Sequence, residues 1–142
     1  MVELDNLFTG VMLTENQRLL MLMDVQFRDP EEACGLLGGL GHQTLAVVPV
    51  TNMLRSTNRY RMEPKEQLHA FNLFEAQGLE VTGIYHSHPA GPSQPSQSDI
   101  NEAYYPDAVH LIWYKTSEGW GCRAFRIHGG SFREVDILID HH

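Results

Sequence analysis

The stretch "GIYHSHPAGPSQPSQSDI", residues 83–100, decides how the rest of the sequence is interpreted. It begins with an apolar, β-branched run typical of a buried strand, and His86 and His88 stand at the end of that run. Side chains alternate between faces along a strand, so these two histidines point the same way with Cα atoms roughly 6.5 Å apart. Two imidazoles at this spacing can share one metal ion at about 2.0–2.1 Å from each nitrogen.

A proline-rich polar loop follows the histidine pair. Pro89, Pro92 and Pro95 reduce the entropy that is lost when the loop is held in one shape. We expect the loop to bring Ser96 and Asp99 back to the strand end, where Asp99 would be a third ligand and one position would stay open for water. Three protein ligands plus water is typical of catalytic zinc sites. The simpler interpretation, a helix that begins at a Ser96 N-cap, is compatible because a cap fixes where both side chains point.

A water activated by a metal also needs a base, and Glu32 is the candidate. It stands at the start of the apolar segment "EACGLLGG", residues 32–39. By composition alone, Glu31 and Glu32 are more simply interpreted as solvated charges at a junction between a helix and a strand. The base role therefore depends on what the rest of the motif implies.

The order of the remaining elements predicts an α/β fold with one mixed sheet and helices packed on it. A first helix is expected over 14–29, where Thr14 and Gln17 fit a capping box and Leu19, Met23 and Phe27 recur on one face. A second helix is expected over 64–78, and a short one from Ser96 to about Tyr105. Strands are expected over 32–39, 44–50, 59–62, 79–88, 108–115, 121–128 and 132–138.

Composition limits the class of protein. The chain has 142 residues, 42% of them hydrophobic, which fits a single domain over 1–142 with its own core. Its net charge of −8 argues against nucleic acid or an anionic membrane surface as the main partner. No apolar run is long enough to span a bilayer, the N-terminal segment lacks a signal peptide's basic flank, and two cysteines are too few for a disulfide framework. We therefore expect a cytoplasmic protein, and we exclude His141 and His142 from the site because they resemble the remnant of a purification tag.

The same residues resemble the JAMM motif of the MPN+ metalloprotease family, whose pattern is E…H-[ST]-H-x7-S-x-x-D. Glu32, the segment "HSHP" at 86–89 and the segment "SQSD" at 96–99 match it in order and spacing. The similarity extends from about residue 14 to 138. The segments "PVTN" at 49–52 and "RYRMEP" at 59–64 also look like bacterial and archaeal members of this family.

The resemblance implies a role for each matched residue. His86, His88 and Asp99 would ligate one zinc ion per chain, Glu32 would be the general base, and Ser96 would donate a hydrogen bond to the oxyanion. It also implies a mixed sheet flanked by helices, related to the deaminase-like architecture. Cys34 is then not needed as a nucleophile, and we expect it to be a small buried residue.

The resemblance further implies hydrolysis of the amide or isopeptide bond after the C-terminal Gly-Gly of ubiquitin or a ubiquitin-like protein. Some bacterial members act on sulfur-carrier proteins with the same tail and release an amino acid such as cysteine. This chain has no Cys/His cluster after Asp99 for a second zinc site. We therefore expect a small prokaryotic carrier as the partner, and we expect its tail to pair with the strand edge near 59–62.

The sequence leaves two other functions open. The chain could be a zinc amidase for a small metabolite, or a catalytically silent MPN scaffold, although the intact set of five motif residues argues against a scaffold. The basic residues Arg55, Arg59 and Arg61 have two interpretations as well. They form either a solvated strand face or a contact for an acidic partner surface or its tail.

Overall fold

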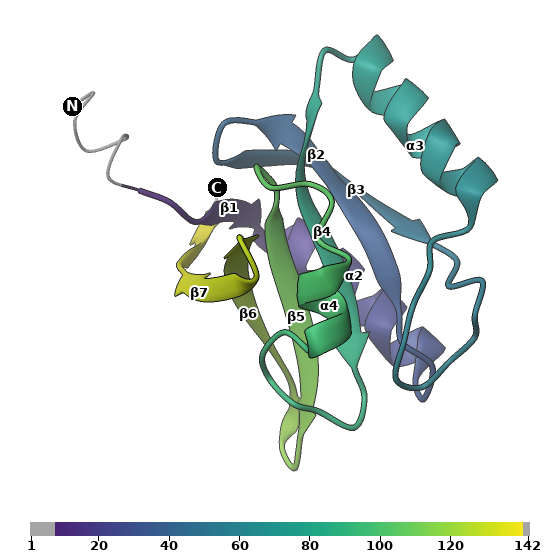
Figure 1. Ribbon diagram of the computed structural model, residues 1–142. Helices are drawn as coiled ribbons and strands as arrows, with labels where there is room; N and C mark the ends of the chain where they lie inside the picture. The colour runs from purple at the N-terminus through teal and green to yellow at the C-terminus, as the bar shows by residue number, and fades with distance from the viewer. Residues whose placement is uncertain (1–7, 141–142) are drawn as a thin grey trace.

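The computed structural model describes residues 8–140, so the interpretation of His141 and His142 lies outside the described residues. One mixed sheet runs through the molecule in the order β7-β6-β5-β4-β2-β3-β1-β8, with helices on both faces (Figure 1). The predicted α/β fold with a mixed sheet is thereby confirmed. The strands are β1 Val11–Thr14, β2 Cys34–Leu40, β3 Gln43–Val50, β4 Glu80–His88, β5 Val109–Thr116, β6 Gly119–His128, β7 Ser131–Val135 and β8 Ile137–Asp140.

The sheet is curled, because its two edge strands are neighbours in the sequence. β7 and β8 lie at opposite ends of the strand order, yet only Asp136 separates them. β4 lies in the interior of the sheet, antiparallel to β2 and parallel to β5. A strand paired on both sides is held along its whole length, so the end of β4 is a rigid place for functional side chains.

Three helices pack on this sheet in the described residues. α2, Glu15–Arg28, lies behind the sheet in Figure 1, and α4, Gln97–Asn101, lies in front of β5. α3, Pro64–Ala76, begins with proline at its first turn, where the missing N–H would have no helical partner. The predicted capping box of the first helix is present, because Thr14 accepts from the Gln17 N–H and the Gln17 side chain accepts from the Thr14 N–H.

Several boundaries differ from the sequence predictions. Residues 59–61 form no strand, and Met62 makes only an isolated bridge to Asn52. The strand expected over 132–138 is split at Asp136 into β7 and β8, β1 was not foreseen, and α4 ends at Asn101. Pairing partners that are distant in sequence create β1 and β8, so local patterns could not reveal them.

The apolar row on α2 also has an unexpected orientation. Leu19, Met23 and Phe27 face solvent, and Phe27 is 82% exposed. The helix instead buries Met21 and Val25 against the sheet. Both rows have helical spacing, and only the packing of the helix decides which of them is covered.

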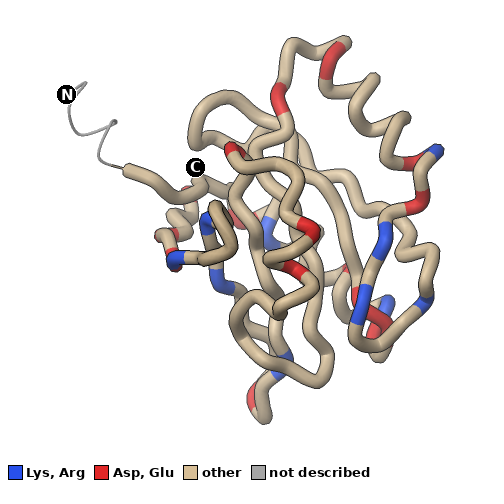
Figure 2. Tube along the Cα trace, in the orientation of Figure 1, with Lys and Arg blue, Asp and Glu red and all other residues tan. Residues whose placement is uncertain are grey.

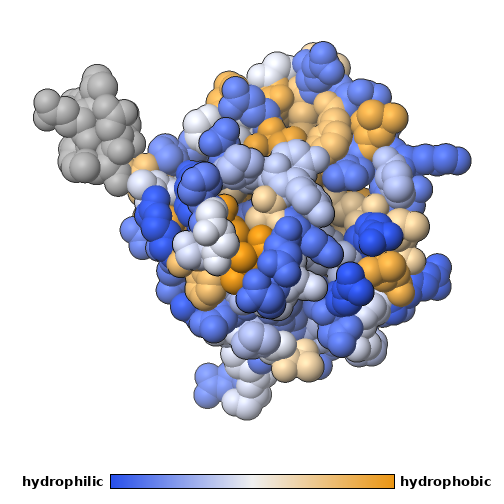
Figure 3. All heavy atoms as spheres, in the orientation of Figure 1, coloured by the Kyte–Doolittle hydropathy of each residue, from blue (hydrophilic) through white to orange (hydrophobic). Residues whose placement is uncertain are grey.

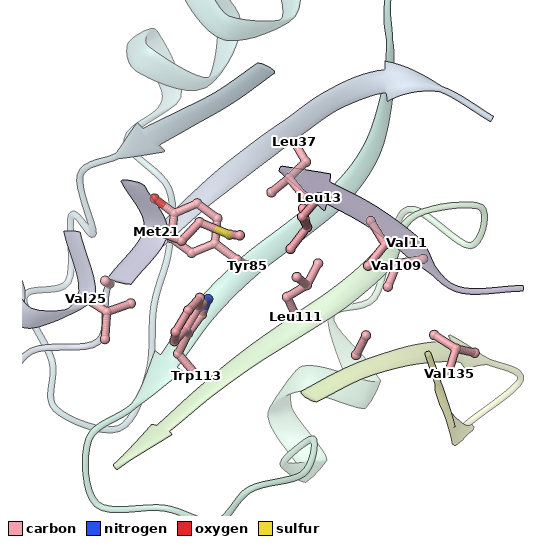
Figure 4. Packing of buried hydrophobic residues seen from close by; sticks show 12 residues of the cluster. Val11, Leu13, Met21, Val25, Leu37, Tyr85, Val109, Leu111, Trp113 and Val135 are labelled. Atoms are coloured by element: carbon pink, nitrogen blue, oxygen red, sulfur yellow. The ribbon is translucent and has the colours of Figure 1, made fainter. Parts of the chain in front are cut away.

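Two apolar clusters hold the helices to the sheet. The cluster under α2 contains Leu37, Tyr85, Leu111 and Trp113, whose side chains point toward one another in Figure 4. The other cluster joins α3 to the opposite face of β2 and β4. Across residues 8–140, no helix combines the length and the apolar character needed to cross a membrane.

Tyr85 carries one polar contact into the α2 cluster. Its hydroxyl donates a 2.8 Å hydrogen bond to Asp24 on α2. Burial raises the pKa of Asp24 above its ordinary value, although the bond from Tyr85 and the nearby Arg28 oppose that shift. The phenol therefore stabilises a carboxylate in a poorly solvated position.

We expect Tyr85→Phe to lower the free energy of unfolding by about 1–3 kcal/mol at neutral pH, because the carboxylate loses its buried donor. Asp24→Asn is the matched variant, since it keeps an acceptor and removes the charge.

A carboxyl with a raised folded-state pKa opposes folding increasingly as pH rises above its unfolded value of about 3.8. In Asp24→Asn, the free energy of unfolding should therefore depend less on pH above that value, as measured by urea titrations at several pH values. A strong loss of stability in Asp24→Asn at neutral pH would contradict this account.

Candidate metal centre and active site

Three potential metal ligands converge at the end of β4. The Nε2 atoms of His86 and His88 are 3.0 Å apart, and Oδ2 of Asp99 lies 3.1 Å from each of them. Ligand atoms bound tetrahedrally at 2.0–2.1 Å from one zinc ion are about 3.3–3.4 Å apart. The three atoms are therefore within a few tenths of an ångström of the spacing that one small ion requires.

Contacts with neighbouring residues orient both histidine rings. His88 Nδ1 lies 2.7 Å from the carbonyl oxygen of Pro92, so this nitrogen carries a hydrogen and Nε2 is the ring nitrogen that faces the cluster. His86 is fully buried and stacks on the ring of Tyr60, with centroids 4.7 Å apart. Both rings are thus oriented by contacts outside the three-atom cluster.

The loop that carries the third ligand is tied to the sheet. Arg123 on β6 donates to the side chain and the carbonyl of Ser93 and also pairs with Glu134. At the end of the loop, the Ser96 N–H donates to Asp99 Oδ2, and Ser96 Oγ accepts from the Asp99 N–H. The expected N-cap is present, and the same contacts aim Asp99 at the histidines.

Glu32 lies on the other side of the histidines, just before β2. Its side-chain oxygen and nitrogen atoms of His86 and His88 all lie within 4.8 Å of one another, so these three groups together could hold a metal ion. Asp99 Oδ2 lies closer, at 3.1 Å from Nε2 of each histidine. We therefore place Asp99, and not Glu32, as the third member of the tight cluster.

The main chain around Glu32 is tightly held. Its N–H donates to the Ser56 carbonyl, and its own carbonyl accepts from the Asn52 side chain. The next residue, Ala33, donates to Ser87 Oγ at 2.8 Å and accepts from the Ser87 N–H. Glu32 is thus locked to β4 beside the two histidines.

The two carboxyl groups of the site have pKa values shifted in opposite directions. Burial raises the pKa of Glu32 to about 7, a shift that His88 opposes and Asp99 reinforces. Burial alone would raise the pKa of Asp99 as well, but hydrogen bonds from His86 and His88 hold that pKa well below its usual range. One carboxyl is therefore ionised throughout the neutral range, while the other can exchange a proton near neutral pH.

The histidines are shifted in opposite directions. Burial lowers the pKa of His86. Burial would lower the pKa of His88 too, but its bonds to Asp99 and to the Pro92 carbonyl outweigh that effect and raise the pKa. A metal ion must displace any proton from Nε2 of both rings, so acid should compete with metal binding.

The structure brings all five motif residues together, namely Glu32, His86, His88, Ser96 and Asp99. Their individual roles stay predictions. Sequence reasoning missed the supporting residues Asn52, Tyr60, Ser87 and Arg123. The segments "PVTN" and "RYRMEP" pointed to the first two only as a resemblance, and no local pattern indicated the contact of Arg123 with the loop.

Two further expectations can be compared with the structure. Cys34 is fully buried, its Sγ donates to the Val50 carbonyl, and burial raises its pKa to about 12, so the expected buried role is confirmed.

The basic residues Arg55, Arg59 and Arg61 do not lie on a strand. Figure 2 shows basic positions along the segment that leads into α3, where Arg59 pairs with Glu102 at 3.6 Å and Arg61 lines a cavity.

The family described as prokaryotic homologs of the JAB domain matches residues 15–128. This chain belongs to that family. The resemblance to the JAMM and MPN+ proteins is thereby confirmed. A solution structure of a protein from Desulfitobacterium hafniense shares 33% identity at a TM-score of 0.83, covering 93% of this chain and 94% of that one. A JAB1/MPN domain protein from Archaeoglobus fulgidus, 17% identical with a TM-score of 0.58, shares the fold over 93% of this chain and 98% of its own.

Curated relatives cover a similar part of the chain. A desampylase from Pyrococcus furiosus is 42% identical over 111 residues, which are 77% of this chain and 76% of the relative. A CysO-cysteine peptidase from Mycobacterium tuberculosis is 34% identical over 113 residues, 78% of this chain and 77% of the relative. A probable TtuB-protein conjugate cleaving protease from Thermus thermophilus is 35% identical over 111 residues, 78% of this chain and 70% of the relative.

We expect His88→Ala to lose bound metal, because it removes one of the three convergent ligand atoms. Metal content after exhaustive dialysis, measured by atomic spectroscopy, tests this. His128→Ala is the matched control, since His128 is an exposed residue at the end of β6 and should leave the metal content unchanged. Stoichiometric metal in the His88 variant would show that the site has been placed wrongly.

Proposed function

We propose that this chain is a single-domain, cytoplasmic zinc metallopeptidase. It hydrolyses the amide or isopeptide bond after the C-terminal Gly-Gly of a small ubiquitin-like or sulfur-carrier protein. The observation that carries the proposal is the convergence of His86, His88 and Asp99, with a buried carboxyl of raised pKa beside them, in a chain of this family. Zinc is the metal of choice because two imidazoles and one carboxylate at tetrahedral spacing suit it.

The relatives support the substrate class. Their names describe a CysO-cysteine peptidase, desampylases and a protease that cleaves TtuB-protein conjugates. Each name concerns the release of something joined to another molecule. We infer the same class of reaction for this chain, with a carrier protein as one half of the conjugate.

Zinc, when bound by His86, His88 and Asp99, supplies a Lewis acid that polarises a carbonyl and lowers the pKa of water to about 7. Glu32 accepts the proton from the attacking water and delivers it to the leaving amine. A carboxyl whose pKa is near 7 can do both, because at neutral pH it accepts and releases a proton with little change in free energy. No covalent intermediate with the protein is needed.

Ser96 donates a hydrogen bond to the developing oxyanion. Its Oγ already accepts from the Asp99 N–H, and a hydroxyl that accepts still has a hydrogen to donate. The helix cap fixes the position of the oxygen before the substrate arrives. Such preorganised donors stabilise charge that develops in the transition state.

Burial of Glu32 favours an enzyme over a silent scaffold. The residue is only 5% exposed, and a buried carboxyl without a partner charge is costly. A scaffold would gain nothing from keeping it beside two histidines. An amidase for a free metabolite is the second candidate, and the substrate experiment separates it from the main proposal.

Matched conjugates test the proposed function. We expect a carrier that ends in Gly-Gly to be cleaved at least a hundredfold faster than the same carrier ending in Ala-Val, with the same leaving group on both. Glycines carry no side chain, so a Gly-Gly tail can approach the metal ligands more closely than a tail with bulkier residues. Glu32→Gln serves as the control, since it should retain zinc and lose nearly all turnover.

Two results would count against this function. Equal rates on the two tails would indicate a broader amidase, and so would a free small-molecule amide cleaved as fast as the conjugate. Substantial turnover by Glu32→Gln with full zinc would remove Glu32 from the base role. Product identity, determined by mass spectrometry, shows whether the bond after the last glycine was cut.

We expect Ser96→Ala to lower kcat by roughly 10²–10³, the usual loss for one oxyanion donor. The same change removes the helix cap and should cost about 1 kcal/mol of stability. Melting curves and rates separate the two effects, and zinc content should stay stoichiometric. A variant that is less stable but fully active would show that Ser96 serves only as a cap.

A further inference from the structure

A cavity of about 360 Å³ adjoins the candidate metal centre. Tyr60 belongs to both places, because it lines the cavity and also stacks on His86. The cavity lies on the face of the sheet that carries α3 and α4, where apolar surface is exposed among hydrophilic residues (Figure 3). Its lining residues are Leu36, Tyr60, Arg61, Met62, Gln67, Ile84, Glu102, Tyr104, Tyr105 and His110.

The floor of the cavity is one row of the sheet. Leu36 on β2 pairs with Ile84 on β4, which pairs in turn with His110 on β5. The neighbouring row on the same face contains His86, two residues further along β4. Two residues of strand span about 6.6 Å, so the cavity begins one such step from the metal ligands.

His110 is the unusual residue of this floor. It is only 3% exposed, and its Nε2 atom is buried without a hydrogen-bond partner among the described residues. Burial lowers its pKa to about 4, so the ring is neutral at neutral pH. His110 lines the cavity, and its neutral ring can exchange one hydrogen bond with an incoming group once the ring turns its buried nitrogen toward the cavity.

The walls of the cavity are mostly uncharged. Met62, Leu36 and Ile84 are apolar, and Arg61 and Glu102 supply opposite charges at the lining. These two charges cancel, so the lining has no net charge that would attract an occupant of either sign. An uncharged side chain with an apolar stem and one polar group is the best match to this lining.

We propose that the cavity receives the side chain of the carrier residue that precedes the Gly-Gly, and that His110 selects a hydroxyl or carboxamide group on it. This inference rests on the proposed function. An extended tail whose last glycine lies at the metal ligands places the residue two positions earlier about 6.6 Å away, which is the distance between the two rows. Selectivity then arises because an apolar analogue leaves the buried imidazole without a partner.

Near-isosteric pairs of tail residues test the assignment. Carrier conjugates ending in Thr-Gly-Gly and Val-Gly-Gly form one pair, and Gln-Gly-Gly and Met-Gly-Gly form the other. We expect the zinc-loaded wild-type chain to prefer the polar member of at least one pair by roughly tenfold in kcat/KM. His110→Phe should bring that ratio to about one, while zinc content stays stoichiometric.

Two further variants complete the design. His128→Phe changes an exposed histidine of β6 and should keep the wild-type ratios. His110→Met replaces the ring with a flexible apolar chain and serves if His110→Phe does not fold. Circular dichroism and zinc content establish that each variant is intact before rates are compared.

The outcomes separate this inference from the proposed function. Turnover of diglycine conjugates with equal rates in both wild-type pairs would overturn the pocket assignment alone, as would a ratio that survives in His110→Phe or His110→Met. Selectivity that follows the leaving group instead of the tail residue would assign the cavity to the leaving group and overturn it too. Failure to cleave any diglycine conjugate would overturn the proposed function, and the inference with it.

Discussion

Three Lewis-basic atoms, two imidazole nitrogens and one carboxylate oxygen, meet within about 3 Å of one another at the end of β4. The surrounding hydrogen bonds hold these three atoms in place. Buried polar groups are costly unless they are paired, and a shared cation satisfies all three at once. The contacts of Pro92, Ser96 and Arg123 keep the atoms close together, so little reorganisation is needed when an ion binds.

The sheet supplies the rigidity that such a cluster needs. β4 has neighbours on both sides, and the α2 cluster packs against its opposite face through Tyr85. Ser87, which lies between the two histidines, points to that opposite side of the strand and holds Ala33. A single segment of three residues therefore presents two histidines on one face and anchors the segment of Glu32 from the other.

Burial has opposite consequences at the two carboxyl groups of the site. Asp99 accepts three hydrogen bonds at one oxygen and remains ionised, whereas Glu32 has less compensation and its pKa rises to about 7. This division gives two side chains of the same chemistry different protonation behaviour, as the proposed roles of ligand and proton carrier require. The neighbouring cavity extends the same surface by one row of the sheet, so the cavity floor and the candidate site are built on the same strands.

The sequence by itself determined the motif, the order of most elements and the two helix caps. Alternation along a strand put His86 and His88 on one face, and the Ser96–Asp99 spacing predicted a cap, because both rules depend only on residues a few positions apart. Only the tertiary structure decided which face of α2 is covered, that β1 and β8 exist, and that residues 59–61 form no strand. It also brought Arg123 to the loop, Asn52 to Glu32, and His110 into the row beside His86. These contacts join residues up to several strands apart, and their energy depends on packing and pairing partners that no local pattern contains.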